Sequence, residues 1–264
     1  MNPFSRDQLA AFRTLRNAYP DARIVLIGAS ALGMHLNMTW RNTADVDLVL
    51  TISMSELDAK LSQLEGWRHD PKRAQRWIAP NDVILDLVPA SPEAIAAGSL
   101  TWHGGRVMDL SGVGLALRVD HQEELEDLGI GVAPIPVIVL MKMVAYVDAH
   151  DREKDLHDIA YILDEYPKTD DERFFSDEIF ELGLNEATAR AFILGREMRD
   201  VVGDDGDTSI VERFLERVRD GWRWSRFVTV SPWRYDEEQL RTRLDALNDG
   251  FSNTPGDGLE HCRR

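Results

Sequence analysis

The sequence predicts an α+β protein with an α/β N-terminal half and a helical C-terminal half. Three short apolar runs bounded by turn residues indicate strands: "RIVLIG" (23–28), "DVDLVLTI" (45–52) and "VILDLVPA" (83–90). Helical patterns separate these runs, and only helical patterns follow Pro136. The expected parts are a core domain over 1–134, a helical domain over 135–248 and a disordered tail over 249–264.

Composition and charge narrow the class of protein. The chain has 264 residues with 44% apolar content, which is enough for a substantial core. A formal charge of −16 argues against binding nucleic acid through overall charge, although a local basic groove is compatible with it. The single cysteine, Cys262, excludes a disulfide within the chain. We expect a cytoplasmic protein without a membrane segment, because the longest apolar stretch is too short and contains Lys142.

The first elements follow from local signals. Ser5 and Gln8 form a capping-box pattern before apolar residues at helical spacing, which predicts a helix over 6–18. Residues 23–38 predict a strand, a tight turn and a helix, and 53–66 predict a capped helix that closes at Gly66. The run 83–90 is apolar on both faces except at Asp86, as expected of a central strand.

Later segments give weaker signals. Residues 104–118, "GGRVMDLSGVGLALR", contain short strand-like pieces with glycines, and "HQEELEDLG" (121–129) predicts a brief helix or a loop. Two helices follow, in "VIVLMKMVAYVDAH" (137–150) and "REKDLHDIAYILDEY" (152–166). The tail has the composition of a frayed terminus.

Three aspartates interrupt apolar strands. Asp45 and Asp47 share one face of their strand, about 7 Å apart along the chain, and Asp86 interrupts the next apolar strand. Such carboxylates repel one another unless cations neutralise them, and Mg²⁺ prefers oxygen ligands of this kind. The alternative is that Asp45 caps a turn and Asp86 pairs with a core arginine such as Arg41 or Arg106.

The turn "GAS" (28–30) lies between a strand and a helix. Backbone N–H groups and the positive end of a helix dipole at such a turn favour an anion, so this turn is a candidate phosphate cradle. The alternative is a simple helix start with Ser30 as its cap.

Together these residues resemble the nucleotidyltransferase fold, a mixed sheet flanked by helices and followed by a helical domain. The closer resemblance is to the AbiEii/AbiGii-type nucleotidyltransferases of bacterial abortive-infection and toxin-antitoxin systems. Two blocks carry it, "GASAL…RNTADVDLVL" and "KMVAYVDAHDREKDLHDIAYIL", within about residues 20–165. Asp82 and Asp109 are alternative third acids, but the apolar context of "VILDLV" favours Asp86.

The resemblance implies a role for each matching position. Asp45, Asp47 and Asp86 would be catalytic and ligate Mg²⁺, with two ions expected, and Asp86 would also help to deprotonate the acceptor hydroxyl. The implied nucleotide-binding residues are Gly28, Ala29, Ser30, Arg41, Lys142, Asp155 and Asp158. Ala29 departs from the wider superfamily, in which Gly-Gly or Gly-Ser is frequent. Thr43 is expected to be a turn residue.

The second block places one charge, Lys142, in an apolar helix. Facing a cleft, its ammonium would neutralise phosphates, whereas the structural alternative is that it extends to solvent from a helix edge. Asp155 and Asp158 are three residues apart, on neighbouring helical positions, and are expected to orient Lys142, Arg152 or the base. Their ordinary interpretation is a solvated acidic face.

The predicted activity is transfer of a nucleoside monophosphate from a nucleoside triphosphate to a hydroxyl, with release of pyrophosphate. If the toxin resemblance holds, RNA such as a tRNA 3′ end is the expected acceptor and a cognate antitoxin the expected partner. The segments 68–77 and 217–235 mix arginines with tryptophans that either stack on bases or form core. The alternatives are a small-molecule, aminoglycoside-type nucleotidyltransferase, which the acidic charge favours, and a non-catalytic nucleotide-binding module.

Overall fold

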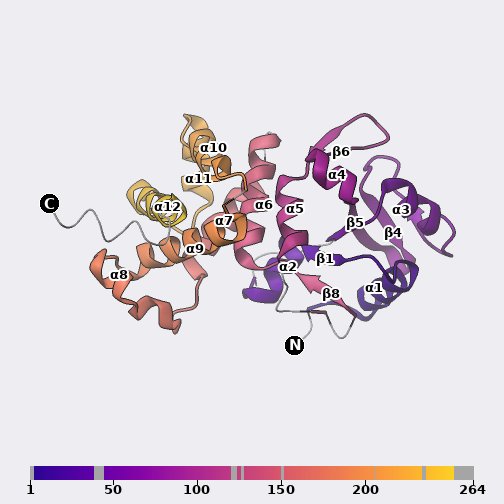
Figure 1. The fold of residues 1–264 in the computed structure, drawn as a ribbon, viewed down its shortest axis with the longest axis horizontal. Helices are drawn as coiled ribbons and strands as arrows, with labels where there is room; N and C mark the ends of the chain where they lie inside the picture. The colour runs from indigo at the N-terminus through magenta and orange to yellow at the C-terminus, as the bar shows by residue number, and fades with distance from the viewer. Residues whose placement is uncertain are drawn as a thin grey trace. The chain divides into compact units, whose positions relative to one another are not determined.

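The structure is a computed structural model that describes residues 3–38, 45–119, 124–125, 128–149, 152–204, 206–233 and 236–252 (Figure 1). The chain divides into two compact units, Met1–Ile138 and Val139–Arg264. The division falls inside helix α6 (Ile135–Asp148), four residues beyond the predicted boundary at 134. All strands that the structure describes belong to the first unit.

A mixed six-stranded sheet forms the centre of the first unit, in the order β3-β4-β5-β2-β1-β8. β2 is parallel to β5 and β1 is parallel to β8, whereas the other neighbours are antiparallel. The strand bounds are β1 Ile24–Ile27, β2 Asp45–Leu50, β3 Arg68–His69, β4 Arg76–Ala79, β5 Val83–Pro89 and β8 Ile130–Val132. The predicted α+β class with a mixed sheet is therefore confirmed, and β5 lies inside the sheet as expected.

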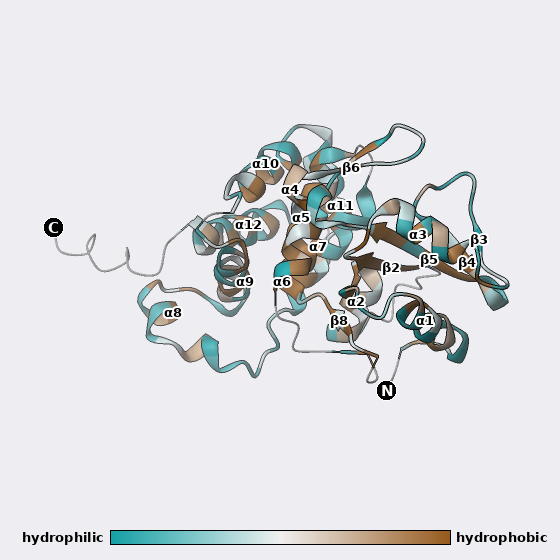
Figure 2. Cartoon of the chain, turned by 45° about the vertical axis from the view of Figure 1, so that its right-hand side comes forward, coloured by the Kyte–Doolittle hydropathy of each residue, from teal (hydrophilic) through white to brown (hydrophobic). Residues whose placement is uncertain are grey.

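Burial of apolar side chains explains why these segments form strands. Figure 2 shows β2 and β5 as the brown, hydrophobic centre of the sheet. Leu26, Leu48, Leu85 and Leu87 are fully buried. Each buried leucine removes apolar surface from water at about 25 cal/mol per Å², so the sheet supplies much of the driving force for folding this unit.

Five helices flank the sheet in the described part of the first unit: α1 Arg6–Ala18, α2 Gly28–His35, α3 Met54–Leu61, α4 Pro92–Ala97 and α5 Ser111–Arg118. A short 3₁₀ turn, Pro80–Asp82, precedes β5, and β6 (Ser99–Thr101) pairs with β7 (Val107–Asp109) in a second small sheet. α1 has the predicted bounds and the predicted capping box, in which the Ser5 hydroxyl accepts from the Gln8 amide at 3.1 Å.

Two predictions in this unit are wrong in part. α3 begins with the expected cap at Ser53 but ends at Leu61 rather than Gly66, because tighter turns follow, such as Gln63 N–H to Lys60 C=O at 3.1 Å. Within the segment 104–118, only 107–109 form a strand, and 111–118 form α5. α5 contains Gly112 and Gly114, which have low helix propensity, and its residues 112–116 are all buried, so the local sequence did not favour a helix here. Most of 121–129 lies outside the described residues.

The second unit is helical throughout its described residues, as predicted. After α6 its helices are α7 Glu153–Glu165, α8 Asp177–Glu181, α9 Glu186–Val202, α10 Ser209–Val218, α11 Trp222–Val230 and α12 Glu237–Ser252, with a 3₁₀ turn at Glu172–Phe175.

In the described part of the chain, the helices are too short or too polar to cross a bilayer.

α9 and α12 pack against each other at very short backbone distance. A side chain at Gly195 of α9 would overlap the Leu247 carbonyl, and one at Gly250 of α12 would overlap the Phe192 carbonyl. The predicted tail therefore begins too early: residues 249–252 are the last residues of α12, with Gly250 and Phe251 buried against α9. Residues 253–264 lie outside the described part of the chain.

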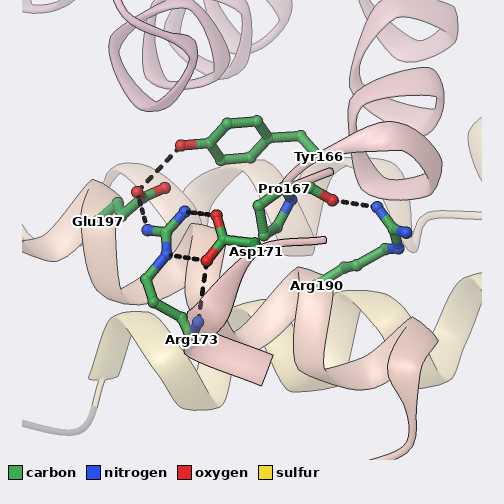
Figure 3. Close-up of polar contacts among 6 residues, drawn as sticks. All are labelled: Tyr166, Pro167, Asp171, Arg173, Arg190 and Glu197. Atoms are coloured by element: carbon green, nitrogen blue, oxygen red, sulfur yellow. Dashed lines mark hydrogen bonds and ion pairs between the residues drawn. The ribbon is translucent and has the colours of Figure 1, made fainter. Parts of the chain in front are cut away.

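A polar network attaches the segment after α7 to α9 (Figure 3). Glu197 of α9 accepts a hydrogen bond from the Tyr166 hydroxyl at 3.0 Å and pairs with Arg173, which also binds Asp171 at 2.7 Å. Burial, together with the neighbouring Glu197 charge, raises the pKa of the Tyr166 phenol above its usual value. Arg190 donates to the carbonyl of Pro167. These hydrogen bonds and ion pairs join the segment after α7 to α9, so the network stabilises the fold of the second unit.

Candidate active site

The strand register places the three predicted aspartates on one face of the sheet. Asp47 of β2 is paired in register with Asp86 of β5, and Asp86 is paired with Arg76 of β4. Residues paired across adjacent strands point to the same face, and Asp45 shares the face of Asp47 because side chains alternate along a strand. Three carboxylates therefore lie on one face of the two central strands, β2 and β5.

Arg76 neutralises two of these carboxylates. Its Nε and Nη2 atoms donate to the two oxygens of Asp86 at 2.7 and 2.9 Å, and Nη2 also donates to Asp45 Oδ2 at 2.6 Å. The hydrogen bond to Asp86, opposed by burial, raises the pKa of the Arg76 guanidinium, so Arg76 stays charged. The side chains of Arg76 and Asp86 are each only 11% exposed, whereas that of Asp45 is 35% exposed.

Among the described residues Asp86 thus pairs with a core arginine, as the structural alternative proposed, but that arginine is Arg76, which the sequence did not single out. Arg41 lies outside the described residues, and Arg76 holds the position considered for Arg106. The signal that would have found it is the antiparallel pairing of β4 and β5 through the short turn at 80–82. Thr43, a predicted turn residue, also lies outside the described part of the chain.

Gly28 brings the Asp47 carboxylate to the first residue of α2. Gly28 has φ +68°, and a Cβ atom there would overlap Asp47 Oδ2, so this position needs glycine both for its backbone conformation and for space. Asp47 consequently lies at the N-terminal end of a helix, where unpaired N–H groups and the helix dipole favour negative charge. The predicted strand and helix are joined here directly, with β1 ending at Ile27 and α2 beginning at Gly28.

Ser30 does not cap α2. The residue at the cap position is Ile27, and the Ser30 hydroxyl instead donates to the backbone carbonyl of Asp45 at 3.3 Å. The alternative of Ser30 as a helix cap is therefore wrong, because its side chain ties α2 to the start of β2. Ala29 and Ser30 are both buried, at 6% and 9% exposure. Their predicted contact with a triphosphate stays a prediction and would have to use backbone N–H groups.

The acids are arranged around an arginine rather than around a cation-sized space. Among the described residues, no three His, Cys, Asp or Glu side chains are placed to hold a metal ion. The donor chemistry of Asp45, Asp47 and Asp86 nevertheless fits Mg²⁺, since all three offer hard carboxylate oxygens from one face. An ion at this site would have to replace Arg76 as the partner of Asp45 and Asp86.

The second predicted block forms a buried charge cluster in the second unit. Lys142 of α6 is 6% exposed, and its Nζ lies 2.5 Å from Asp158 Oδ2 and 3.3 Å from Asp155 Oδ1. Arg152 also pairs with Asp155. The two structural alternatives are therefore wrong: Lys142 does not extend to solvent, and Asp155 and Asp158 are not a solvated face. The orientation of Lys142 and Arg152 by these aspartates is confirmed, whereas contact with a nucleotide stays a prediction.

The two arginine- and tryptophan-containing segments have different structures. Residues 68–77 run through the β3–β4 hairpin, where Trp77 is 2% exposed and Arg68 pairs with Asp82. In the segment 217–235, Trp224 is 8% exposed, whereas Trp222 is 59% exposed. The interpretation of Trp222, Trp224 and Trp233 as core is thus right for Trp224, wrong for Trp222 and right only in part for Trp233, which is half-buried against Arg243.

Comparisons with known proteins add a distant structural likeness. No protein-family model and no curated protein sequence matches the chain. The chain is similar in structure to a candidate nucleotidyltransferase from H. pylori, at TM-score 0.37 and 15% identity over 94% of this chain and 97% of the other. It is also similar to JHP933 from Helicobacter pylori, at TM-score 0.31 and 14% identity over 94% of each chain. The specific resemblance to AbiEii-type toxins stays a prediction, and the function has to be argued from this chain's own residues.

Proposed function

We propose that the first unit catalyses transfer of a nucleoside monophosphate from a nucleoside triphosphate to a hydroxyl group. The observation that carries the proposal is the placement of Asp45, Asp47 and Asp86 on one face of β2 and β5, with Asp47 at the start of α2. In this reaction a bond forms between the acceptor oxygen and the α-phosphorus while the bond to pyrophosphate breaks. Carboxylates beside an anion-favouring helix start suit such chemistry, which depends on positioning and charge neutralisation.

Asp45, Asp47 and Asp86 would hold Mg²⁺ in this proposal. The bound cation supplies neutralisation of phosphate charge, and the carboxylates fit it by ligand type. In this proposal Asp86 would accept the acceptor's proton once Arg76 releases it. The support for Arg76 as a displaceable partner is that Asp45, which it also binds, remains 35% exposed.

A non-catalytic nucleotide-binding module is the second candidate. The observation in its favour is that the Arg76 guanidinium donates two hydrogen bonds to Asp86, as in a structural ion pair. A carboxylate held in this way has a structural partner in place of a metal ion. Such a module would bind a triphosphate without releasing pyrophosphate, so measuring both quantities separates the two candidates.

The decisive test is Asp47→Asn. This change keeps the shape of the side chain that lies against Gly28 but removes the charge, so we expect incorporation from α-³²P-labelled triphosphates to fall by at least about 100-fold. Asp82→Asn is the matched control, because Asp82 is an exposed acid whose side chain is 82% accessible. Chelation of Mg²⁺ should reduce incorporation by the wild type equally. Unchanged incorporation by Asp47→Asn would reject the assignment.

The acceptor is tested in the same assay. The resemblance proposes RNA, whereas the formal charge of −16 favours a cationic small molecule. Each of the four labelled triphosphates is incubated with total RNA and, separately, with aminoglycosides. Label in RNA alone supports the RNA acceptor, and label in the aminoglycoside alone supports the small-molecule alternative. Growth arrest on expression, relieved by co-expression of a neighbouring gene, would support a toxin with a cognate antitoxin.

A further inference from the structure

A cavity of about 280 Å³ in the second unit has four arginines among its nine lining residues. We call it the arginine cavity and define it by Arg152, Arg217, Arg223 and Arg226, together with Glu153 and Trp222. These residues come from the turn between α6 and α7, the end of α10 and the first turns of α11. Since Glu153 is the one carboxylate among the lining residues, positive charge exceeds negative charge by three along the wall.

This local charge is the reverse of that of the whole chain, which carries −16. Ion pairs reduce it. Arg152 pairs with Asp155, whose side chain is only 5% exposed, so this arginine already has a buried partner. Arg226 pairs with Glu153, and Arg223 pairs with Asp220 at 2.8 Å, but Glu153 is 41% exposed and Asp220 is 72% exposed. Surface pairs of this second kind contribute about 0–1 kcal/mol, so a phosphate group with more charge and more acceptor oxygens can replace the partners of Arg223 and Arg226.

Trp222 adds an aromatic surface that core packing does not explain. The buried residues of α11 are Trp224, Phe227 and Val228, which form its core face, whereas Trp222 is 59% exposed. The Arg223 guanidinium lies 4.9 Å from the centroid of the Trp222 ring. An exposed indole next to several guanidiniums combines a stacking surface with phosphate donors, the pairing by which proteins bind nucleotides of single strands.

We propose that the arginine cavity binds one nucleotide unit, with its phosphate on the guanidiniums and its base stacked on Trp222. The volume supports a small ligand, because about 280 Å³ is just below the roughly 300–1,000 Å³ typical of small-molecule pockets. The site uses residues of the second unit alone. It uses none of Asp45, Asp47 and Asp86, which are in the first unit, so it can fail while the transferase proposal holds.

The test is a set of titrations of the full-length chain in EDTA with AMP, ribose 5-phosphate and adenosine. AMP should bind most tightly, because it alone carries both phosphate and base. Trp222→Ala should weaken AMP binding by about 5- to 100-fold and leave ribose 5-phosphate unchanged. Arg226→Gln should weaken both phosphorylated ligands by about 10-fold or more. Glu153→Gln should instead tighten them, because it removes the carboxylate that competes for Arg226.

Arg219→Ala is the matched control, since Arg219 is an arginine near α11 that pairs with Asp245 and does not line the cavity. It should bind AMP like the wild type, and circular dichroism should show that every variant is folded. Photolabelling with 8-azido-AMP should mark peptides from residues 217–226. Absence of AMP binding, an AMP affinity of Trp222→Ala and Arg226→Gln equal to that of the wild type, or label only in the first unit would overturn the proposal.

The source of the nucleotide is identified by competition. A 5′-phosphorylated single-stranded hexanucleotide that displaces AMP and also depends on Trp222 supports binding of a nucleic-acid end. AMP binding that the hexanucleotide does not displace supports a free mononucleotide. The hexanucleotide should displace AMP equally well from Arg219→Ala and from the wild type, whereas Arg226→Gln should lose this binding. That result shows that the arginines of the cavity, rather than the basic side chains of the protein in general, hold the ligand.

Discussion

Arg76 is the residue that makes the acidic face of the sheet possible. Asp86 is 8% exposed, and a buried carboxylate without a partner costs several kcal/mol. Arg76 reaches it from the adjacent antiparallel strand with two hydrogen bonds and also holds Asp45. The same contacts that stabilise the strands therefore control two of the three carboxylates of the proposed site.

Replacement of Arg76 should destabilise the protein far more than replacement of its neighbour Arg68. Arg76→Ala leaves Asp86 buried without its partner, so we expect the free energy of unfolding to fall by about 3–5 kcal/mol. Arg68→Ala removes a pair whose side chains are 59% and 82% exposed, and it should change stability by less than about 1 kcal/mol. Urea denaturation followed by circular dichroism measures both values.

The same variant tests the affinity of the acids for a cation. With Arg76 absent, Mg²⁺ is the natural replacement for its charge, so magnesium should raise the melting temperature of Arg76→Ala more than that of the wild type. Arg68→Ala should respond like the wild type. Equal magnesium effects in all three proteins would contradict the proposal that these carboxylates hold the ion.

At this scale the sequence predicted the acids but not their partner. Asp45, Asp47 and Asp86 are visible because charged residues interrupt apolar strands, and alternation places the first two on one face. The identity of the arginine depends on the register between β4 and β5, which the turn at 80–82 sets. Lys142 shows the same limit, because its two aspartates were visible in the sequence but their burial was not.

Among the elements, α2 connects the fold most directly with the proposed site. It begins at the residue that follows the end of β1, and Asp47 occupies the space that a side chain at Gly28 would take. Any movement of this helix start would therefore displace the Asp47 carboxylate. The element is short and its cap position is an isoleucine, so its place depends on packing and on the Ser30 bond to Asp45.

Two glycines of α2 should respond in opposite ways to alanine. Gly28→Ala forces a left-handed backbone on alanine and overlaps Asp47, so we expect a loss of at least about 2 kcal/mol in unfolding free energy and a loss of nucleotidyl transfer. A Cβ atom at Gly33 meets no atom within 4 Å, so Gly33→Ala should gain about 0.5–1 kcal/mol through helix propensity. Thermal denaturation compares the two, and equal effects would contradict the assigned role of Gly28.

Elements with local signals were predicted well, and elements that depend on tertiary packing were not. The capping box at Ser5 fixed α1 to the residue. α5 was missed because its two glycines have low helix propensity and its middle is buried, and the end of α12 was predicted as tail because Gly250 has a packing role that composition does not reveal. In each case the deciding interaction is with a segment distant in sequence.

For the molecule as a whole, the distribution of charge matters more than its sum. A net charge of −16 opposes binding to polyanions, yet four arginines gather in the arginine cavity, whereas Arg76 is used to neutralise carboxylates of the sheet. The sequence predicted this contrast in outline, since the basic segments stand out in an acidic chain. It did not predict that arginines of the segment 68–77 form ion pairs within the first unit, or that arginines of 217–235 line a cavity. Both outcomes depend on tertiary contacts.

Moderate salt should stabilise the protein at neutral pH and lose this effect near pH 4.8, the isoelectric point. At pH 7 the charge of −16 repels itself, and 0.3 M NaCl screens that repulsion, whereas the exposed ion pairs that salt also weakens are worth little. We expect a gain of about 1 kcal/mol, or about 2–4 °C in melting temperature, measured by differential scanning calorimetry. Near pH 4.8 the net charge vanishes, so only the weakening of ion pairs remains. Destabilisation by NaCl at pH 7 would mean that local ion pairs such as Arg76 with Asp86 outweigh the repulsion of the whole molecule.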